Sequence, residues 1–189
     1  MTLSALGIFS AAGAGGIAGD YELIETRIVS GTSTGSVTFS SLGSFSSVYK
    51  HLQIRASVRT NRADTTDNLL LRINSDSTSS NYHTHSLVGV GSVVVSEASN
   101  SFTGAKVMQP TAASATANNF DAGVIDILDA YATKNKTLRT LSGNAGNNRI
   151  WLTSNLWMNT ATITSIELLP QLGTALAAGS RFSLYGIKG

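Results

Sequence analysis

Residues 50–60 read KHLQIRASVRT, and this stretch decides the fold class. Its apolar and polar residues sit at alternating positions: Leu52, Ile54, Ala56 and Val58 against His51, Gln53, Arg55, Ser57 and Arg59. Successive side chains of a strand point to opposite faces, so this alternation predicts a β-strand with one buried and one solvent-exposed face. The polar face carries no acid, and we expect it to lie against a partner surface.

Comparable short runs follow one another from Tyr21 onward, rich in β-branched and aromatic residues and separated by Gly, Ser, Asn and Asp. We expect strands at residues 21–30, 36–40, 50–60, 68–73, 81–87, 92–96, 122–128, 137–141, 148–157, 162–169 and 181–187. This spacing is typical of a sandwich or barrel, and about ten strands suit a jelly roll. The sequence therefore predicts an all-β chain, with a single jelly-roll-like β-sandwich over residues 21–189.

The remaining segments are expected to be irregular. Residues 105–119 are rich in Ala, Thr and Ser and predict a long loop, and residues 126–136 predict at most one short turn of helix. Neither heptads nor a fixed-period repeat occurs, which excludes a coiled-coil stalk and a solenoid.

The first nineteen residues contain no charged side chain and are rich in Ala and Gly. A signal peptide needs a basic region before its apolar run, and none precedes Leu3. Glycines and serines interrupt the sustained apolar stretch of about twenty residues that a membrane-spanning helix requires. We predict that residues 1–20 form an extended N-terminal arm that docks on another subunit, with these candidate anchor residues: Leu3, Leu6, Ile8, Phe9 and Ile17.

Charged residues make up 13% of the chain, against about a quarter in an average protein. A surface built from hydroxyl and amide groups is typical of extracellular β-proteins, fibres and coats. The net charge is +2, and the arginines around residue 59 are followed at once by Asp64 and Asp67. Nucleic-acid affinity depends largely on neutralised phosphates, so we expect no nucleic-acid partner.

The chain contains no cysteine, which excludes disulfides, thiol catalysis and thiolate metal sites. Their absence favours folding in a reducing cytoplasm. No G-x-S-x-G elbow and no phosphate-binding loop occurs, and we predict neither a cofactor nor an enzymatic activity.

His83 and His85 form an H-x-H pair on an expected strand, so both imidazoles point to the same face. Such a pair can share a metal in a jelly-roll metalloenzyme, with His51 as the third ligand that the chain can offer. No carboxylate follows within a few residues and no histidine follows later. We therefore favour two surface histidines over a metal site.

Two further motifs contain acidic residues that could bind a cation or act in catalysis. Asp126 and Asp129 could form an acid–base pair, or Asp126 could meet Glu25 or Glu167 across the fold. We favour instead a buried aspartate satisfied by the backbone and a second aspartate in a turn. Residues 74–81 faintly resemble a calcium loop, but only Asp76 is acidic and no closing glutamate is present.

Trp151 and Trp157 share one face of the expected strand at residues 148–157, and Ile150, Leu152 and Leu156 share the other. If the aliphatic face forms the core, the tryptophans form either a subunit contact or a sugar-stacking platform. Subunit packing is the favoured interpretation, because Trp dominates protein interfaces. The candidate interface or glycan-contact residues are Trp151, Trp157, Tyr82, His83 and His85.

Several segments resemble short virion structural proteins of tailed bacteriophages, cyanophages among them, often described as tail-fibre-like or appendage proteins. The segments are YELIE (21–25), YKHLQIRASVRTNR (49–62), LLLRIN (69–74), GVIDILDAY (123–131) and RFSLYGIKG (181–189). The resemblance spans nearly everything after residue 20 and carries over no catalytic residue. It implies a homo-oligomer, most often a trimer, on the virion surface.

The sequence thus leads to a non-enzymatic bacteriophage virion protein, a tail appendage or fibre-like host-attachment module docked by its N-terminal arm to other virion proteins. It would assemble in the bacterial host cytoplasm and could contact a host surface polysaccharide. Two alternatives remain open: a capsid decoration (cement) protein and a free carbohydrate-binding module.

Overall fold

A computed structural model describes residues 19–144, 146 and 148–189 of the chain. The predicted arm over residues 1–20 therefore lies outside the described residues except for Gly19 and Asp20. Its candidate anchor residues Leu3, Leu6, Ile8, Phe9 and Ile17 lie outside them as well.

The described chain is built from strands and two short 3₁₀ helices, at Leu42–Phe45 and Ser79–Asn81. The strands are β1 (Tyr21–Ile28), β2 (Val37–Phe39), β3 (His51–Val58), β4 (Leu69–Ile73), β5 (Tyr82–Val90), β6 (Val93–Ser99), β7 (Ala105–Met108), β8 (Asp121–Leu128), β9 (Lys136–Asn144), β10 (Arg149–Trp157), β11 (Ile166–Pro170) and β12 (Arg181–Ile187). Among the described residues, no helix is long and apolar enough to cross a membrane.

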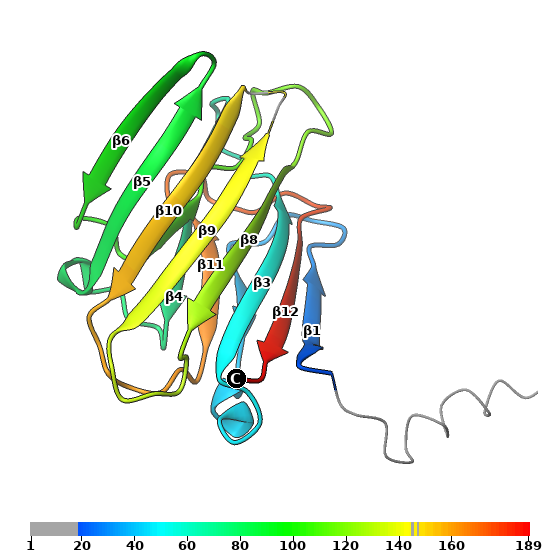
Figure 1. Cartoon of the computed structure of the whole chain (residues 1–189). Helices are drawn as coiled ribbons and strands as arrows, with labels where there is room; N and C mark the ends of the chain where they lie inside the picture. Colours follow the sequence, from blue (N-terminus) through cyan, green and yellow to red (C-terminus); the bar gives the residue numbers. More distant parts are fainter. Residues whose placement is uncertain (1–18, 145, 147) are drawn as a thin grey trace, which may run out of the picture.

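The strands form two antiparallel sheets packed as a jelly-roll-like β-sandwich (Figure 1). The large sheet has eight strands in the order β1-β12-β3-β8-β9-β10-β5-β6, and the small sheet has four in the order β2-β11-β4-β7. The fold is therefore the all-β sandwich that the alternating patterns predict.

The core lies between the two sheets and is made by the residues that alternation assigns inward. On β3, Leu52, Ile54 and Val58 are fully buried. They pack with Ile125 of β8 and Leu168 of β11 in one continuous apolar cluster. Burying such side chains contributes about 1.5–3 kcal/mol each relative to leaving them in water.

Each predicted run overlaps one observed strand, but two local predictions are wrong. The expected loop at residues 105–119 contains β7, four residues that are all buried against the large sheet. The expected helical turn at residues 126–136 is instead the end of β8 and a turn in which Asp129 has φ 49°. A left-handed residue stops a strand but does not start a right-handed helix.

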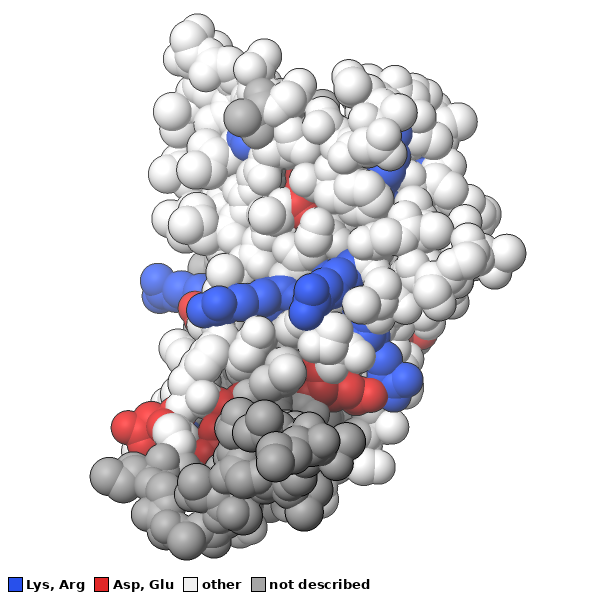
Figure 2. All heavy atoms as spheres, turned by 90° about the vertical axis from the view of Figure 1, so that its right-hand side faces the viewer, with Lys and Arg blue, Asp and Glu red and all other residues white. Residues whose placement is uncertain are grey.

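The two edges of the large sheet differ in charge. The β1 edge carries Glu25 paired with Arg27 at 2.7 Å, and Glu22 paired with Lys188 at 3.2 Å. Figure 2 shows basic and acidic side chains gathered on this side of the molecule. The opposite edge, β6, carries Glu97 as its one charged residue.

Candidate binding face

Trp151 and Trp157 do share one face of β10, as predicted, but that face points into the sandwich. Their exposed fractions are 2% and 1%. The aliphatic face is the one in contact with solvent, with Ile150 at 57% and Leu152 at 51%. The prediction that the tryptophans form an interface or a glycan platform is therefore wrong, because the small sheet and its connecting loops cover them.

Tyr82 is also buried, at 1% exposure, and cannot serve as the predicted surface contact. Its hydroxyl donates to the carbonyl oxygen of Asp76 and accepts from the backbone N–H of Ile73, both at 3.0 Å. Burial raises the pKa of Tyr82 to about 12. The side chain therefore fixes the loop after β4.

The Asp76 carboxylate holds the same loop from the other side. It accepts hydrogen bonds from Trp157 Nε1 and Asn81 Nδ2, both at 2.8 Å, and from the backbone N–H of Thr78 at 2.9 Å. Burial opposes ionisation, but these donors outweigh it and lower the pKa of Asp76 to about 2. The segment that faintly resembles a calcium loop is thus a turn organised by one carboxylate, that of Asp76.

The outer face of the large sheet, which points away from the small sheet, carries a row of aliphatic residues in register. Leu152 pairs with Leu87 of β5 on one side and with Leu141 of β9 on the other. Leu141 in turn pairs with Val124 of β8. Together with the neighbouring Ile150 and Val94 they form what we call the apolar band: Leu87, Val94, Val124, Leu141, Ile150 and Leu152.

Most of the apolar band is solvent-exposed, with Leu87, Leu141 and Val94 at 51%, 55% and 68%. Gly89 and Gly143 flank Ile150 in the register. A Cβ added at Gly143 would lie 2.7 Å from the carbonyl oxygen of Arg149, so this position excludes any side chain. A hollow of about 650 Å³ lies here, bordered by Ile150 and Leu141.

A polar row runs beside the apolar band on the outer face. Strand register places Gln53, Asp126, Arg139, Ser154 and His85 next to one another on five successive strands. Gln53 donates to Asp126 at 2.7 Å and accepts from the Tyr21 hydroxyl at 2.6 Å. The row therefore offers amide, guanidinium, hydroxyl and imidazole groups for hydrogen bonding.

His83 and His85 both lie on the outer face, because His83 pairs with Leu156 and His85 with Ser154. They line a shallow hollow of about 500 Å³ together with Ser154. His51 lies in the same register row as His83 but on β3, and four strand spacings separate the two strands. That distance is about 19 Å, so the three histidines cannot share an ion.

The acids weighed as catalytic partners are held apart by the fold. Asp126 is bound to Gln53 on the outer face, while Asp129 sits in a turn and pairs with Lys134 and with His51 at 3.5 Å. The lysine and histidine contribute to lowering the pKa of Asp129 below its usual value. The buried aspartates of the described chain are neither of these but Asp67 and Asp121, which the sequence interpretation missed.

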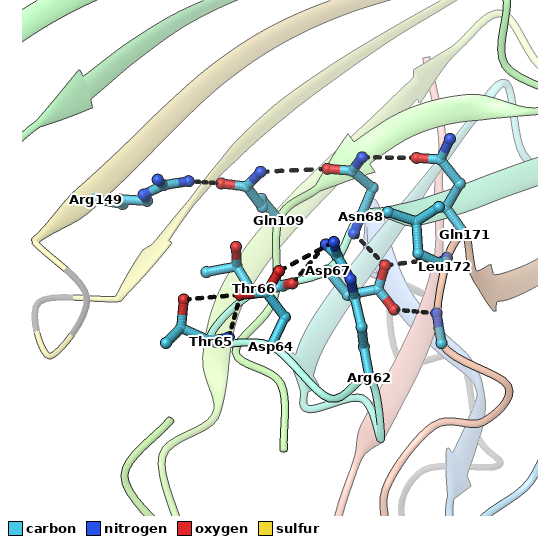
Figure 3. Close-up of polar contacts among 11 residues, drawn as sticks. Arg62, Asp64, Thr65, Thr66, Asp67, Asn68, Gln109, Arg149, Gln171 and Leu172 are labelled. Atoms are coloured by element: carbon cyan, nitrogen blue, oxygen red, sulfur yellow. Dashed lines mark hydrogen bonds and ion pairs between the residues drawn. The ribbon is translucent and has the colours of Figure 1, made fainter. Parts of the chain in front are cut away.

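Asp67 belongs to a polar network at one end of the sandwich (Figure 3). Its carboxylate accepts from the backbone N–H groups of Asn68, Leu172 and Gly173 at 2.8–3.1 Å. The Asn68 side chain donates to Gln171 at 2.6 Å and accepts from Gln109 at 3.4 Å. Gln109 also contacts Arg149 of β10. The donors and acceptors of this network satisfy one another. The network joins the loop before β4 and the loop after β11 to β10.

Arg62 and Arg59, near this network, also hold loops in place. Arg62 pairs with Asp64 at 3.0 Å and donates to the Thr66 carbonyl at 2.9 Å. Arg59, expected on the polar face of its strand, directs its guanidinium to four carbonyl oxygens between Ala113 and Asn119. These arginines therefore fix loops.

The inner face of β5, β9 and β10 is unusually polar. Thr84 donates to Asn155 Oδ1 at 2.6 Å, and the hydroxyls of Ser86 and Thr153 lie 3.3 Å apart. All four residues are buried. Lys106 lies near them, with its ammonium 4.3 Å from the centre of the Trp151 ring and 3.1 Å from Glu97.

Within the part of the chain that the structure describes, no group of three or more His, Asp or Glu side chains is placed to hold a metal ion. The sequence matches no protein-family model and no curated protein. Among solved structures it is similar to galectin LEC-6 of Caenorhabditis elegans, at 9% identity and a TM-score of 0.33, covering 87% of this chain and 96% of that one. It is also similar to arcelin-5, a lectin-like defense protein of Phaseolus vulgaris, at 9% identity and a TM-score of 0.18, covering 92% and 95%.

The apolar band is the feature that sequence reasoning missed. The strand at residues 148–157 has apolar residues on both faces, so alternation alone does not say which face is buried. One signal is present in the sequence: Leu87, Leu141 and Leu152 occur in three runs whose other face carries polar residues, such as Ser86, Thr140 and Asn155. One leucine opposite polar residues on each of three strands indicates a common surface, although not its direction.

Proposed function

We propose that this chain is a non-enzymatic structural protein of a tailed-phage virion, which attaches to other proteins through the outer face of its large sheet. The observation that carries the proposal is the apolar band. Contiguous exposed apolar surface on a soluble protein marks an interaction site. Arg139 and the other polar groups beside the band add directional hydrogen bonds, and the low charge of the whole chain reduces repulsion between packed subunits.

The resemblance of five segments to tailed-phage appendage proteins supports the same proposal and supplies its setting. In that setting the domain is a tail appendage or host-attachment module at the virion surface, and residues 1–20 dock it to the particle. The capsid decoration (cement) protein is the alternative within this class. It would use the same apolar band against capsid subunits.

Particle incorporation tests the proposal. In phage carrying Leu141→Lys or Leu152→Lys, we expect the copy number per purified particle to fall at least tenfold, the effect of about 1.4 kcal/mol of lost contact. Leu172→Lys is the matched control, because it makes the same change at a leucine that is 56% exposed but lies in the loop after β11 of the small sheet. Unchanged incorporation of both leucine variants would refute the outer face as the contact surface.

The arm needs a separate variant. Deletion of residues 1–19 should abolish incorporation while leaving the soluble domain folded, as measured by circular dichroism. Incorporation at the normal level would show that the arm is not the docking element.

A second candidate function, carbohydrate binding, is favoured by the hollow beside His83 and His85. Its imidazoles and the Ser154 hydroxyl suit sugar hydroxyls, and Arg139 lies in the next register position. The tryptophans do not support carbohydrate binding, because they are buried. At least one polysaccharide from a host panel should bind the purified domain, and the His85→Ala variant should lose that binding. No binding across the panel would dismiss this function.

A further inference from the structure

β6 forms an open edge of the large sheet with unusually apolar exposed residues. Val93, Val94 and Val95 are 57%, 68% and 41% exposed. The strand pairs with β5 without interruption, from Val93 opposite Val90 to Ser99 opposite Thr84. β6 therefore presents seven residues of regular strand along an open edge.

The other three sheet edges in the described part of the chain are each protected. β1 carries Glu22, Glu25 and Arg27 and has a register irregularity between Leu23 and Glu25. β2 is only three residues long, and the four residues of β7 are buried. Charges, irregular register, short length and burial are the usual defences of an edge strand against pairing. The Val93–Ser99 edge has none of these except a single acid.

The hairpin turn decides which backbone groups of β6 face outward. Gly91 and Ser92 form a two-residue turn with Gly91 at φ 57°, so Val90 and Val93 are a hydrogen-bonded pair. Bonded and non-bonded pairs alternate along an antiparallel ladder. The N–H and C=O groups of Val94, Ser96 and Ala98 therefore point to the open edge.

The one charge of β6 is compensated within its own chain. Glu97 pairs at 3.1 Å with Lys106, which lies between the rings of Phe102 and Trp151. An identical strand placed alongside would bring no net repulsion. A second copy of this chain is therefore a compatible occupant of the edge, whereas a strongly charged strand would find no partner for its charges.

We propose that two copies of this chain pair antiparallel through β6, joining their large sheets into one continuous sheet. A two-fold axis beside Ser96 places this residue opposite Ser96 of the partner subunit. Val94 then lies opposite Ala98 of the partner subunit, a large side chain against a small one. Glu97 lies opposite Val95 of the partner subunit, so the two carboxylates do not face each other.

The two-fold arrangement also accounts for why an exposed edge need not lead to fibres. An isologous contact uses the same patch on both subunits and closes on itself, leaving no free copy of the edge. The inference goes beyond the proposed function and does not rest on it, because it concerns the isolated protein. It yields a dimer, whereas the resemblance to phage proteins implies a trimer.

Cysteine cross-linking tests the pairing and its register on the full chain, which has no cysteine of its own. Under mild oxidation Ser96→Cys should form a disulfide-linked dimer, because residues facing each other across a ladder lie within disulfide reach. Val94→Cys is the matched control: its two copies would be four residues apart along the strands, about 13 Å. Cross-linking of Val94→Cys but not Ser96→Cys would overturn the proposal.

Sedimentation analysis provides the second measurement. Ser96→Pro removes one outward N–H from each subunit at the centre of the contact. It should weaken dimerisation about 100-fold, tenfold for each hydrogen bond. Ser96→Thr keeps the N–H and should remain dimeric. A wild-type chain that is monomeric throughout a concentration series, or a Ser96→Pro variant that dimerises as tightly, would show that β6 is not the contact.

Discussion

In the half of the large sheet formed by β12, β3 and β8, most inward side chains are aliphatic and most outward ones are polar, with Val124 and Leu128 of β8 as exceptions. In the half formed by β9, β10 and β5 the arrangement is partly inverted: Thr84, Ser86, Thr140, Thr153 and Asn155 are buried, while Leu87, Leu141 and Leu152 are exposed. Both halves belong to one continuous sheet.

The difference shows that stability of the separate domain is not the only constraint on this sequence. The first half follows the ordinary rule of one buried apolar face. In the second, the buried apolar residues Trp151, Trp157, Tyr82, Val88 and Leu138 alternate with buried polar residues, among them the hydrogen-bonded pairs Thr84–Asn155 and Ser86–Thr153. An exposed aliphatic row costs the isolated domain solubility, which is why we interpret it as a surface that another protein covers.

The largest expected effect is at the tryptophans of the inverted half. Trp157→Ala should lower the free energy of unfolding by about 3–5 kcal/mol, through lost burial and a cavity, and it also removes the Nε1 donor to Asp76. Urea unfolding of the purified domain measures this. A decrease in the free energy of unfolding of less than about 1 kcal/mol would mean that the Trp157 ring is not part of the core.

The polar pairs inside the inverted half give the next effect. Thr84→Val should cost about 1–3 kcal/mol, because it leaves the buried Oδ1 of Asn155 without its donor. The double variant Thr84→Val/Asn155→Leu removes both partners and should recover most of that loss, as measured by the same unfolding assay. Additive losses in the double variant would show that the polar pair itself is required.

A pH titration addresses the loop that braces Trp157. The pKa of Asp76 lies at about 2, below its ordinary 3.8, so the fold favours the ionised carboxylate. Its contribution to stability is therefore complete above about pH 5 and is lost progressively as the pH falls through about 2. We expect about 1 kcal/mol after discounting for solvent screening.

The Asp76→Asn variant should lack this part of the acid-induced loss, as followed by Trp fluorescence at fixed urea. Asp20→Asn is the control, since that residue is exposed before β1. An Asp76→Asn variant with the wild-type pH profile would contradict the assigned role of the carboxylate.

The smallest effect is expected on the exposed side of the inverted half. Leu152→Ser should change the free energy of unfolding of the monomeric domain by no more than about 0.5 kcal/mol, because the side chain is 51% exposed. It should also reduce binding of a hydrophobic dye. A loss comparable to that of Trp157→Ala would mean that the outer face is covered within the chain.

The strands were predictable from sequence because period-two alternation depends on local chemistry alone. At residues 50–60 one face is wholly polar, so the direction of burial followed as well, and Leu52, Ile54 and Val58 are fully buried as expected. At residues 148–157 both faces contain apolar residues, and the choice between them depends on where β7 and the small sheet pack. That choice is made by residues distant in sequence.

This ambiguity affected the prediction of the contact residues most. Of the five candidate contact residues, His83 and His85 lie on the outer face, whereas Trp151, Trp157 and Tyr82 are interior. The distribution of strands between the two sheets, which places His51 far from His83, is likewise a property of the long-range pairing and not of any local pattern.

The pairing of β1 with β12 has a mechanical consequence. Tyr21 lies opposite Ile187, so the described chain enters and leaves the domain at the same corner (Figure 1). Tension applied between these two ends would open the β1–β12 ladder one residue pair at a time, as a zipper opens, and not shear the whole ladder at once. The β6 edge lies at the far side of the same sheet, outside the path of that force.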